Sequence, residues 1–332
     1  MPDVIALGEL LIDFVPTVSG TTLIDAPAFV RAPGGAPANV AVGLARLGMS
    51  SGFMGQVGDD AFGRFLAQTL RERGVNVSAL RFTSQARTML AFVSLRSDGE
   101  REFMFYRHPS ADMLYHQEDV DAAYVRTAKV FHFGSISLIG EPARSATLHA
   151  IEVAREAGAL ISYDPNLRLS LWPDADAARD GIRLGWPLAH VIKISEEELA
   201  FIAGKDVQGL QDLASLGQPS QPDLRLLVVT RGARGSRFVT PNTSGDVPGF
   251  SVGAVDATGA GDGFVAGLLK GLLDHPDAFD DPSQLCSICR YANAVGALTT
   301  TQRGAIPALP TAAQVAIFLD KRPNPGGFRI GS

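Results

Sequence analysis

The sequence predicts an α/β fold in which a parallel sheet is covered by helices on both faces, giving three layers, with a small second β-sheet beside it. Two observations predict the large sheet. Short apolar strands alternate with helical patterns along most of the 332 residues, and polar clusters follow several of those strands. A third observation predicts the small sheet, because two segments break the alternation with hairpin-like patterns.

The alternation can be followed element by element from the N-terminus. The expected strands are short and apolar, and they cover residues 4–7, 52–56, 130–133, 160–163, 191–194 and 226–229. The expected helices lie between or after these strands, at residues 39–47, 61–73, 142–157, 196–202, 261–273, 284–300 and 311–320. Glycine, proline and asparagine mark turn-rich loops at residues 242–249 and 322–327.

Residues 13–31 and 87–106 make up the predicted small sheet. The second segment alternates as two strands around Asp98-Gly99, a dipeptide that favours a hairpin turn. We expect the two segments to form a lid, although a structural hairpin on the edge of the main sheet explains the pattern equally well. The main domain would then comprise residues 1–12, 32–86 and 107–332.

Composition argues against two classes of partner. The chain carries 29 basic and 35 acidic residues, a net charge of −6, which disfavours a general nucleic-acid binder or an anionic-membrane binder. It lacks the run of about 18 apolar residues that a transmembrane helix needs. The N-terminus also lacks the basic start and cleavage site of a signal peptide. We therefore expect a cytoplasmic protein with no nucleic-acid or membrane partner.

The two cysteines, Cys286 and Cys289, have a spacing that also occurs in metal and redox sites. A structural zinc site needs four ligands, and the sequence offers no second pair of this kind. Both cysteines lie within an expected helix, so we interpret them as apolar side chains on one packed face.

Residues 256–264, Asp-Ala-Thr-Gly-Ala-Gly-Asp-Gly-Phe, give the strongest indication of chemistry. Gly259 and Gly261 let the backbone approach a ligand, and the helix that follows leaves N–H groups unpaired at its start. Such a start binds phosphate, and its dipole favours the ionised form of Asp262. Phosphoryl transfer needs this pairing of donors and a carboxylate. The simpler interpretation is a glycine-rich helix start with Asp262 as a plain N-terminal charge.

Other polar residues are expected near the same edge of the sheet. Gly34, Gly35 and Asn39 lead into a helix and suit a polyhydroxylated ligand, although an ordinary loop-to-helix turn has the same features. Asp13 follows the first strand and can accept hydrogen bonds from sugar hydroxyls, or it can be a turn residue. Three clusters that follow strands can bind a ligand or cap helices, at residues 164–168, 195–198 and 230–232.

Taken together, these segments resemble the ribokinase-like carbohydrate kinases, and the likeness runs from Gly8 to Pro310. Gly-Gly-x-x-x-Asn at 34–39 looks like the first signature of that family, and Asp-x-Thr-Gly-Ala-Gly-Asp at 256–262 looks like the second. The resemblance narrows to fructokinases through further stretches, at residues 86–88, 102–107, 109–112, 164–168 and 304–310.

The resemblance implies a role for each matching position. In the catalytic group, Asp262 would be the base, and the backbone would form an anion hole at Gly259, Ala260 and Gly261. The sugar would be held by Asp13, Gly34, Gly35 and Asn39. For the alternative of a sugar-acid substrate, Arg107 and Arg168 are the candidate partners of its carboxylate. The nucleotide, ATP, would lie along Ser195, Glu198, Thr230, Gly232, Gly235 and Asn293. Glu198 would act on Mg²⁺ through water, and a monovalent cation such as K⁺ would match Asp256, Thr258 and Gly304.

One position departs from the family pattern. The family usually has Asn where this chain has Ser195, three residues before Glu198. Serine can hydrogen-bond but has a shorter reach, which leaves its part in phosphate or metal binding open.

The implied reaction is transfer of the ATP γ-phosphate to fructose, giving fructose 6-phosphate and ADP. Another sugar or sugar-acid kinase of the same family, such as a 2-keto-3-deoxygluconate kinase, is the alternative. A non-catalytic protein of this fold is disfavoured by the intact Asp262 and glycines, and a nicotinamide oxidoreductase by Phe264, which replaces the third glycine of that fingerprint. We expect one face of the lid to close over the sugar and the other to pack in a homodimer, as in similar kinases.

Overall fold

The main sheet is the central layer of the molecule. We describe it from a computed structural model that covers residues 1–18, 20–95, 101–203, 223–322 and 329–331. The described residues form a ten-stranded sheet whose strands follow each other in space as β14, β13, β12, β11, β10, β9, β8, β1, β4 and β5. Their bounds are β14 (Arg329–Gly331), β13 (Ser244–Val247), β12 (Ser236–Val239), β11 (Leu226–Thr230), β10 (Val191–Ser195), β9 (Leu160–Asp164), β8 (Val130–Gly134), β1 (Val4–Leu7), β4 (Ser51–Gly58) and β5 (Leu80–Thr83).

The sheet is parallel from β5 to β11 and antiparallel beyond it. Every pairing between β5 and β11 is parallel, as the alternation of strands and helices predicts. Strands β12, β13 and β14 then add an antiparallel edge. The prediction of a loop over residues 242–249 was therefore wrong for Ser244–Val247, whose ladder with β12 and β14 forms despite a polar, glycine-containing sequence. Most of the second predicted loop, 322–327, lies outside the described residues.

Helices cover both faces because successive strand residues point to opposite sides of a sheet. In β1, Ile5 and Leu7 are buried in the cluster that holds α4 and α6, whereas Val4 and Ala6 are buried against α1 and its neighbours. The first layer comprises α3 (Ala122–Val125), α4 (Ala143–Glu156), α5 (Ala175–Gly185) and α6 (Glu196–Ala203). The second comprises α1 (Ala36–Arg46), α2 (Ala61–Glu72), α8 (Ala260–Asp274), α9 (Pro282–Thr299) and α10 (Ala312–Asp320). The predicted three-layer fold is confirmed.

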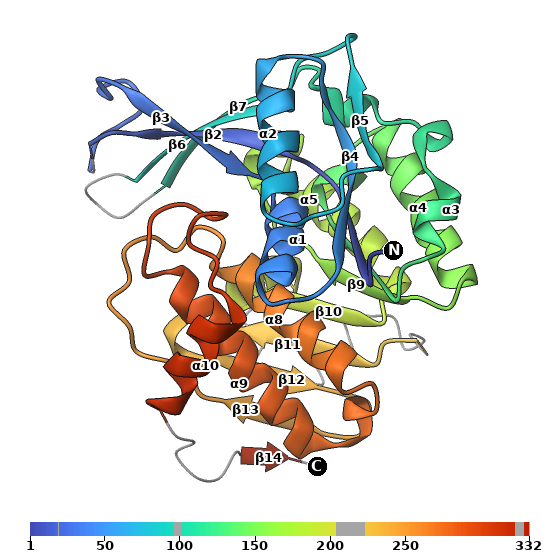
Figure 1. The fold of residues 1–332 in the computed structure, drawn as a ribbon, viewed down its shortest axis with the longest axis vertical. Coiled ribbons are helices and arrows are strands. Elements are labelled where there is room, and N and C mark those ends of the chain that lie inside the picture. Colours follow the sequence, from blue (N-terminus) through green and yellow to red (C-terminus); the bar gives the residue numbers. More distant parts are fainter. Residues whose placement is uncertain (19, 96–100, 204–222, 323–328, 332) are drawn as a thin grey trace.

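The small sheet stands apart from the main body, at the upper left of Figure 1. Its strands, in spatial order, are β3 (Phe29–Gly34), β2 (Leu11–Pro16), β6 (Leu90–Leu95) and β7 (Arg101–Tyr106). β6 and β7 pair in antiparallel fashion, as the hairpin pattern predicts, while their turn at 97–100 lies outside the described residues. The strands extend past the predicted segment 13–31 on both sides, to Leu11 and Gly34.

The two faces of the small sheet carry different aromatic groups. The outer face is defined by Phe14, Phe92, Met104 and Tyr106, with the Phe14 and Phe92 rings stacked at 4.9 Å. The inner face is defined by Asp13, Val93, Phe103 and Phe105, and its two phenylalanine rings stack at 5.8 Å. Helix α2 covers one end of the outer face through Phe62, whose ring meets Phe14 edge-on at 5.8 Å. The inner face is the one that meets the cavity described below.

Two further expectations concern the rest of the chain. Cys286 and Cys289 are free and buried on α9, as expected for packed apolar side chains. No group of three or more His, Cys, Asp or Glu side chains suited to a metal occurs among the described residues. Within that same part of the chain, no helix combines the length and hydropathy needed to cross a membrane.

Candidate active site

The start of α8 is shaped by Gly259, whose φ of 78° lies in the left-handed region. A Cβ at Gly259 would lie 2.7 Å from the Cβ of Ala305, so both the conformation and the space require glycine. The Ala260 N–H donates to the Ala257 carbonyl at 3.2 Å. The Gly261 N–H, by contrast, has no hydrogen-bond partner among the described residues, which leaves a donor at the positive end of the helix dipole.

Asp262 lies buried in the first turn of α8, next to the start of α1. The Asn39 side-chain amide donates to the Asp262 Oδ2 at 2.8 Å, which joins the two helices. Burial raises the pKa of Asp262 above its ordinary value, while the hydrogen bond from Asn39 and the charge of Lys193 act in the opposite direction. The carboxyl group is therefore fixed in position, and its pKa is higher than that of a surface aspartate.

A cavity of about 300 Å³ opens over Asp262, between the inner face of the small sheet and the carboxyl edge of the main sheet. The position agrees with the general rule for ligand sites in open α/β sheets. Of the predicted site residues, those that line it are Asp13, Gly35, Asn39, Arg168, Ser195, Glu198, Asp256, Thr258, Gly259, Gly261, Asp262 and Gly304. Residues from six separate segments of the chain thus meet at one place.

Asp13 reaches the cavity from the small sheet. Its carboxylate occupies the space beside Gly34, where a Cβ would lie 2.2 Å from the Asp13 Oδ2, so Gly34 belongs to the site although it does not line the cavity. Burial raises the pKa of Asp13 to about 7, and Arg168 opposes that rise. Val93, Phe103 and other inner-face residues line the cavity beside it, giving one apolar wall.

Ser195 and Glu198 form a reciprocal cap at the start of α6. The Ser195 Oγ accepts from the Glu198 N–H at 3.1 Å, and the Glu198 Oε2 accepts from the Ser195 N–H at 2.9 Å. The Leu167 N–H donates to the other Glu198 oxygen at 2.7 Å. Burial disfavours the Glu198 carboxylate, but Lys193 and these backbone donors outweigh it, and the pKa of Glu198 lies below its ordinary value. Ser195 therefore fixes the glutamate through the helix cap.

Lys193 is the cavity residue that sequence reasoning missed. It stands inside the apolar strand β10, with 8% of its side chain exposed, and its Nζ donates to the Asp164 Oδ2 at 3.0 Å. Burial alone would lower the pKa of Lys193, but Asp164 and Glu198 raise it above its ordinary value. A Cβ at Gly261 would lie 3.0 Å from this ammonium group. A permanent positive charge therefore lies beside the start of α8. The available signal was a lone lysine among the three apolar residues of this strand.

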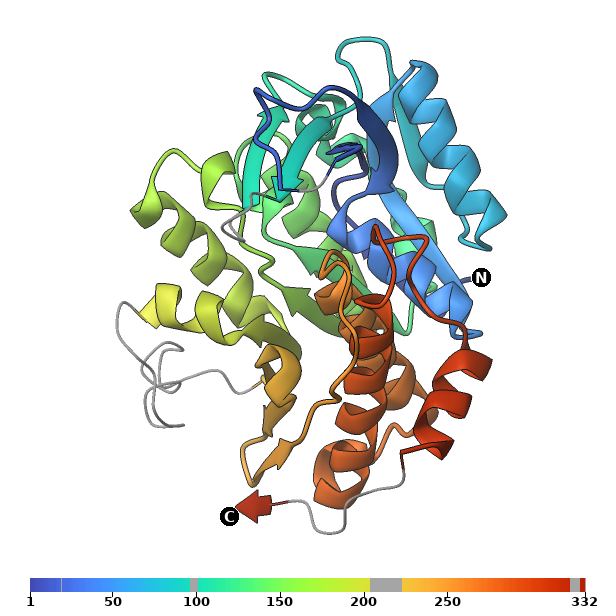
Figure 2. The same cartoon turned by 90° about the vertical axis from the view of Figure 1, so that its left-hand side faces the viewer.

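Asp256, Thr258 and Gly304 lie together beneath the start of α8. The Thr258 N–H and hydroxyl donate to the Asp256 Oδ1 at 2.9 and 2.6 Å, and the Gly304 N–H donates to the Oδ2 at 2.9 Å. Figure 2 shows the orange loop before α8 beside the red loop that follows α9. The structure thus brings the three predicted monovalent-cation residues to one place.

Arg107 does not line this cavity. Its side chain is 6% exposed, its Nη2 lies 2.9 Å from the Asp112 carboxylate, and it also donates to the Ile136 carbonyl. The nearby Glu9 is buried, with its pKa raised to about 7 by burial, and accepts from the Ala36 N–H at 2.8 Å. Arg107 therefore belongs to a buried network beneath the cavity wall.

The predicted nucleotide residues other than Ser195 and Glu198 lie outside the lining of the cavity. Thr230 ends β11 directly beside Ser195, and Gly232 and Gly235 form the turn that follows, both with positive φ. Asn293 is buried on α9 and donates to the Val247 and Pro248 carbonyls at 3.3 Å. These groups extend the carboxyl edge of the sheet to one side of the cavity.

Comparison with known proteins agrees with this geometry. The profile of the pfkB family carbohydrate kinases matches residues 1–312. The chain is 54% identical to the probable fructokinase-4 of Arabidopsis thaliana, over 95% of this chain and 96% of the relative.

Solved structures give the same result. A fructokinase from Xylella fastidiosa with bound ATP is 37% identical, with a TM-score of 0.88 over 97% of this chain and 99% of its own. A fructokinase from Vibrio cholerae O395, with fructose, ADP and calcium ion bound, is 39% identical, with a TM-score of 0.86 over 96% and 99% of the two chains. A double mutant of the Vibrio cholerae protein was solved with fructose, ADP and potassium ion (38% identical, TM-score 0.84, covering 96% and 98%). The family that the sequence resembles is thereby confirmed: this chain belongs to the pfkB family of carbohydrate kinases.

Proposed function

We propose that this protein is an ATP-dependent fructokinase that converts fructose and ATP to fructose 6-phosphate and ADP. One observation carries the proposal: Asp262, held by Asn39 at the start of α8, shares one cavity with Asp13 of the small sheet. A base, a phosphate-binding helix start and an acceptor for sugar hydroxyls thus lie together. The sequence identity to fructokinases supports fructose as the sugar.

The reaction follows from the positions of these groups. Asp262 accepts the proton of the fructose 6-hydroxyl as that oxygen attacks the γ-phosphorus. The bond between the γ-phosphorus and the bridging oxygen breaks, and ADP leaves. In this scheme the anion hole is the backbone of Gly259, Ala260 and Gly261, and the N–H groups of Gly259 and Gly261, which have no partner among the described residues, are its available donors.

A neutral sugar suits the cavity better than a sugar acid. Asp13 accepts from sugar hydroxyls beside Gly34, Gly35 and Asn39, while the apolar wall packs against the ring. Arg107, one of the two predicted carboxylate partners, is held by Asp112. Of these two predicted partners, Arg168 is the one that lines the cavity, so 2-keto-3-deoxygluconate is the substrate that the assay must include.

The nucleotide is proposed to extend from Ser195 and Glu198 along Thr230, Gly232, Gly235 and Asn293. Mg²⁺ suits this site because Glu198 is held ionised, and because a magnesium ion bound mainly by phosphate oxygens and water needs few protein ligands. The ion would neutralise charge on the phosphates. The cluster of Asp256, Thr258 and Gly304 supports a monovalent cation such as K⁺ beneath the anion hole.

We further propose that residues 13–31 and 87–106 act as a lid and that its outer face forms a homodimer. Met104 and Tyr106 on that face are 43% and 57% exposed, which is unusual for large apolar side chains. Sedimentation of the wild type and of Met104→Glu at micromolar concentration tests this. Equal monomer mass for both proteins would contradict the dimer.

The cytoplasm is the proposed compartment, since ATP is available there and the two buried cysteines are free thiols. A fluorescent fusion in cells of the source organism tests it.

The direct test of the activity is ADP release with ATP and a panel of fructose, glucose, ribose and 2-keto-3-deoxygluconate. We expect the highest kcat/KM for fructose and a loss of ~10²–10⁴ in rate for Asp262→Asn. A higher kcat/KM for the sugar acid would overturn the substrate, and full activity of a folded Asp262→Asn protein would remove Asp262 from the mechanism.

A further inference from the structure

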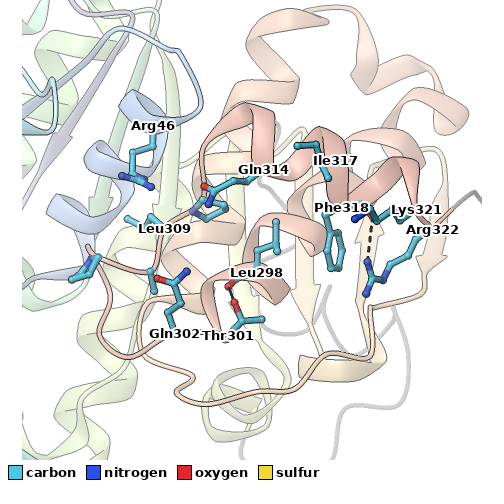
Figure 3. Close-up of a pocket in the computed structure, with 13 residues that line it drawn as sticks. Arg46, Leu298, Thr301, Gln302, Leu309, Gln314, Ile317, Phe318, Lys321 and Arg322 are labelled. Atoms are coloured by element: carbon cyan, nitrogen blue, oxygen red, sulfur yellow. Dashed lines mark hydrogen bonds between the residues drawn. The ribbon is translucent and has the colours of Figure 1, made fainter.

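A second cavity, of about 360 Å³, lies away from the active site between α1, the end of α9 and α10. Its floor is apolar and includes Leu298, Leu309 and Phe318, and Ile317 of α10 borders it with 58% of its surface exposed. Figure 3 shows Arg46 of α1 at one end of this cavity and Lys321 and Arg322 at the other. The volume falls within the range of about 300–1,000 Å³ that is usual for small-molecule sites.

The charges around the cavity have one sign. Three of the described residues that line it are cationic, namely Arg46, Lys321 and Arg322, and none of the lining residues is acidic. Arg322 is engaged, because its guanidinium lies 4.0 Å above the Phe318 ring and donates to the Phe318 carbonyl. An apolar floor between unbalanced cations suits an anion that has an apolar body.

Arg46 is the residue of this cavity that most clearly indicates an anionic ligand. Its Nε is buried and has no hydrogen-bond partner among the described residues. Burial, together with the neighbouring charge of Arg73, lowers the pKa of Arg46 below its ordinary value. A buried charged donor without a partner costs free energy, and a bound anion would recover that cost.

One wall of the cavity also supports the catalytic loop. Pro307, Ala308 and Leu309 line the cavity, while Ala305 of the same segment contacts Gly259 and the Gly304 N–H holds Asp256. A ligand that displaces or stiffens this segment changes the support of the helix start at which the phosphate is handled. Residues 304–309 therefore connect this cavity physically to the start of α8.

We propose that this cavity is a regulatory site for a small organic anion with an apolar body, whose anionic group binds Arg46 and whose body covers Leu309, Ile317 and Phe318. This site goes beyond the proposed function, since no residue that lines it takes part in the proposed reaction.

The test uses 8-anilino-1-naphthalenesulfonate as the amphiphilic anion and N-phenyl-1-naphthylamine as its uncharged counterpart. Fluorescence titrations are done with saturating ADP and fructose, which occupy the active site without turnover because ADP has no γ-phosphate to transfer. We expect one sulfonate probe per chain, bound about five- to tenfold more weakly by Arg46→Gln, since one near charge is removed. The uncharged probe should not distinguish Arg46→Gln from the wild type. Arg126→Gln, an exposed change on the opposite helical layer, is the matched control and should bind both probes normally.

A second pair of variants places charge in the cavity without disturbing the core. Ile317 is exposed, so Ile317→Asp and the nearly isosteric Ile317→Asn should both fold, which thermal unfolding checks. Ile317→Asp should bind the sulfonate probe at least about fivefold more weakly than Ile317→Asn, because only the former adds a negative charge. Equal affinities of Ile317→Asp and Ile317→Asn, or a probe that ADP and fructose displace, would overturn the site.

The link to catalysis has its own readout. Sulfonate probe at a concentration near its wild-type Kd should change kcat for ADP release in the wild type and should change it much less in Ile317→Asp. Charge-dependent binding with an unchanged kcat would show that the site is not regulatory. The titrations need no turnover, so a failure of the proposed site and a failure of the proposed fructokinase activity are separate results.

Discussion

The Asn39 amide donates to the Asp262 carboxylate at 2.8 Å across 223 positions of sequence, and this bond fixes the start of α1 against the start of α8. The same donor lowers the pKa of Asp262, in opposition to burial. A general base works only when it is ionised, so in the proposed mechanism Asn39 extends the activity to lower pH.

Replacement of Asn39 should therefore shift the pH dependence of the reaction. In Asn39→Ala, loss of the hydrogen bond raises the pKa of Asp262 further, and the acidic limb of the kcat profile should move to higher pH. At pH 6 the variant should lose more activity than at pH 8. An acidic limb at the wild-type position would show that Asp262 is not the group that titrates.

The two glycines at the start of α8 should differ in their tolerance to substitution. Gly259→Ala combines a positive φ with a close contact to Ala305, and we expect a fall in kcat of ~10-fold or more. Gly261 has no such φ, and its added Cβ meets only the end of the flexible Lys193 side chain, so Gly261→Ala should be milder. The larger, β-branched side chain of Gly261→Val should weaken phosphate binding more than sugar binding. KM for ATP should therefore rise more than KM for fructose. Equal losses in Gly259→Ala and Gly261→Ala would contradict this account.

A double variant can separate an effect of Lys193 on the reaction from its ion pair with the buried Asp164. Lys193→Met leaves a buried carboxylate unpaired and should lower both Tm and kcat, whereas the exposed control Lys129→Met should change neither. In the double variant Lys193→Met with Asp164→Asn, Tm should recover but kcat should remain about 10²-fold low, because the charge next to the anion hole is still missing. Recovery of kcat together with Tm would mean that Lys193 only balances Asp164.

We expect Asp13 to lower the free energy of unfolding of the ligand-free protein at alkaline pH. Its pKa is about 7 in the folded chain, above the usual unfolded value near 4, so the folded state binds more protons between these values. The contribution of Asp13 to stability therefore falls as pH rises through that window. Asp13→Asn should raise Tm by roughly 2–4 °C at pH 8 and much less at pH 5, while raising KM for fructose. Thermal unfolding of both proteins at the two pH values measures this, and an equal Tm difference at both would exclude it.

Neighbouring residues on β7 should separate the two faces of the small sheet. Phe103→Ser opens the apolar wall of the cavity, so KM for fructose and the ATP hydrolysis without sugar should both rise. Met104→Glu lies on the outer face and should leave both quantities unchanged while it weakens self-association. A rise in KM for Met104→Glu equal to that for Phe103→Ser would show that the faces do not have separate roles.

Most of the parallel part of the main sheet was readable from the sequence because its strands are mainly apolar, as expected for buried parallel strands. The edge strand Ser244–Val247 was not, since a short polar strand that contains glycine has the composition of a loop. Helix α5 was also missed; it starts with Asp174 as its cap after a Trp-Pro pair. In both cases the tertiary structure decides the conformation.

Some residues of the candidate site could likewise be predicted from the sequence, and others could not. Its glycines and carboxylates occur in recognisable local patterns, whereas the use of Lys193 and Arg107 depends on what faces them across the fold. Lys193 comes to the cavity only because Asp164 ends the adjacent strand, and Arg107 is withdrawn from it only because Asp112 lies within reach. No local pattern encodes either pairing.

The small sheet, which includes β2, and the main body contribute different groups to the candidate site. Asp13 and the apolar wall lie on the small sheet, while Asp262, Lys193 and Glu198 lie on the main body. Under the proposed function, part of the sugar preference therefore resides in two short stretches of chain that are separate from the groups proposed to handle phosphate. During evolution, such a chain can acquire a new phosphoryl acceptor, the sugar, while it keeps ATP as the phosphoryl donor. Exchange of residues 13–31 and 87–106 between relatives is the corresponding engineering experiment.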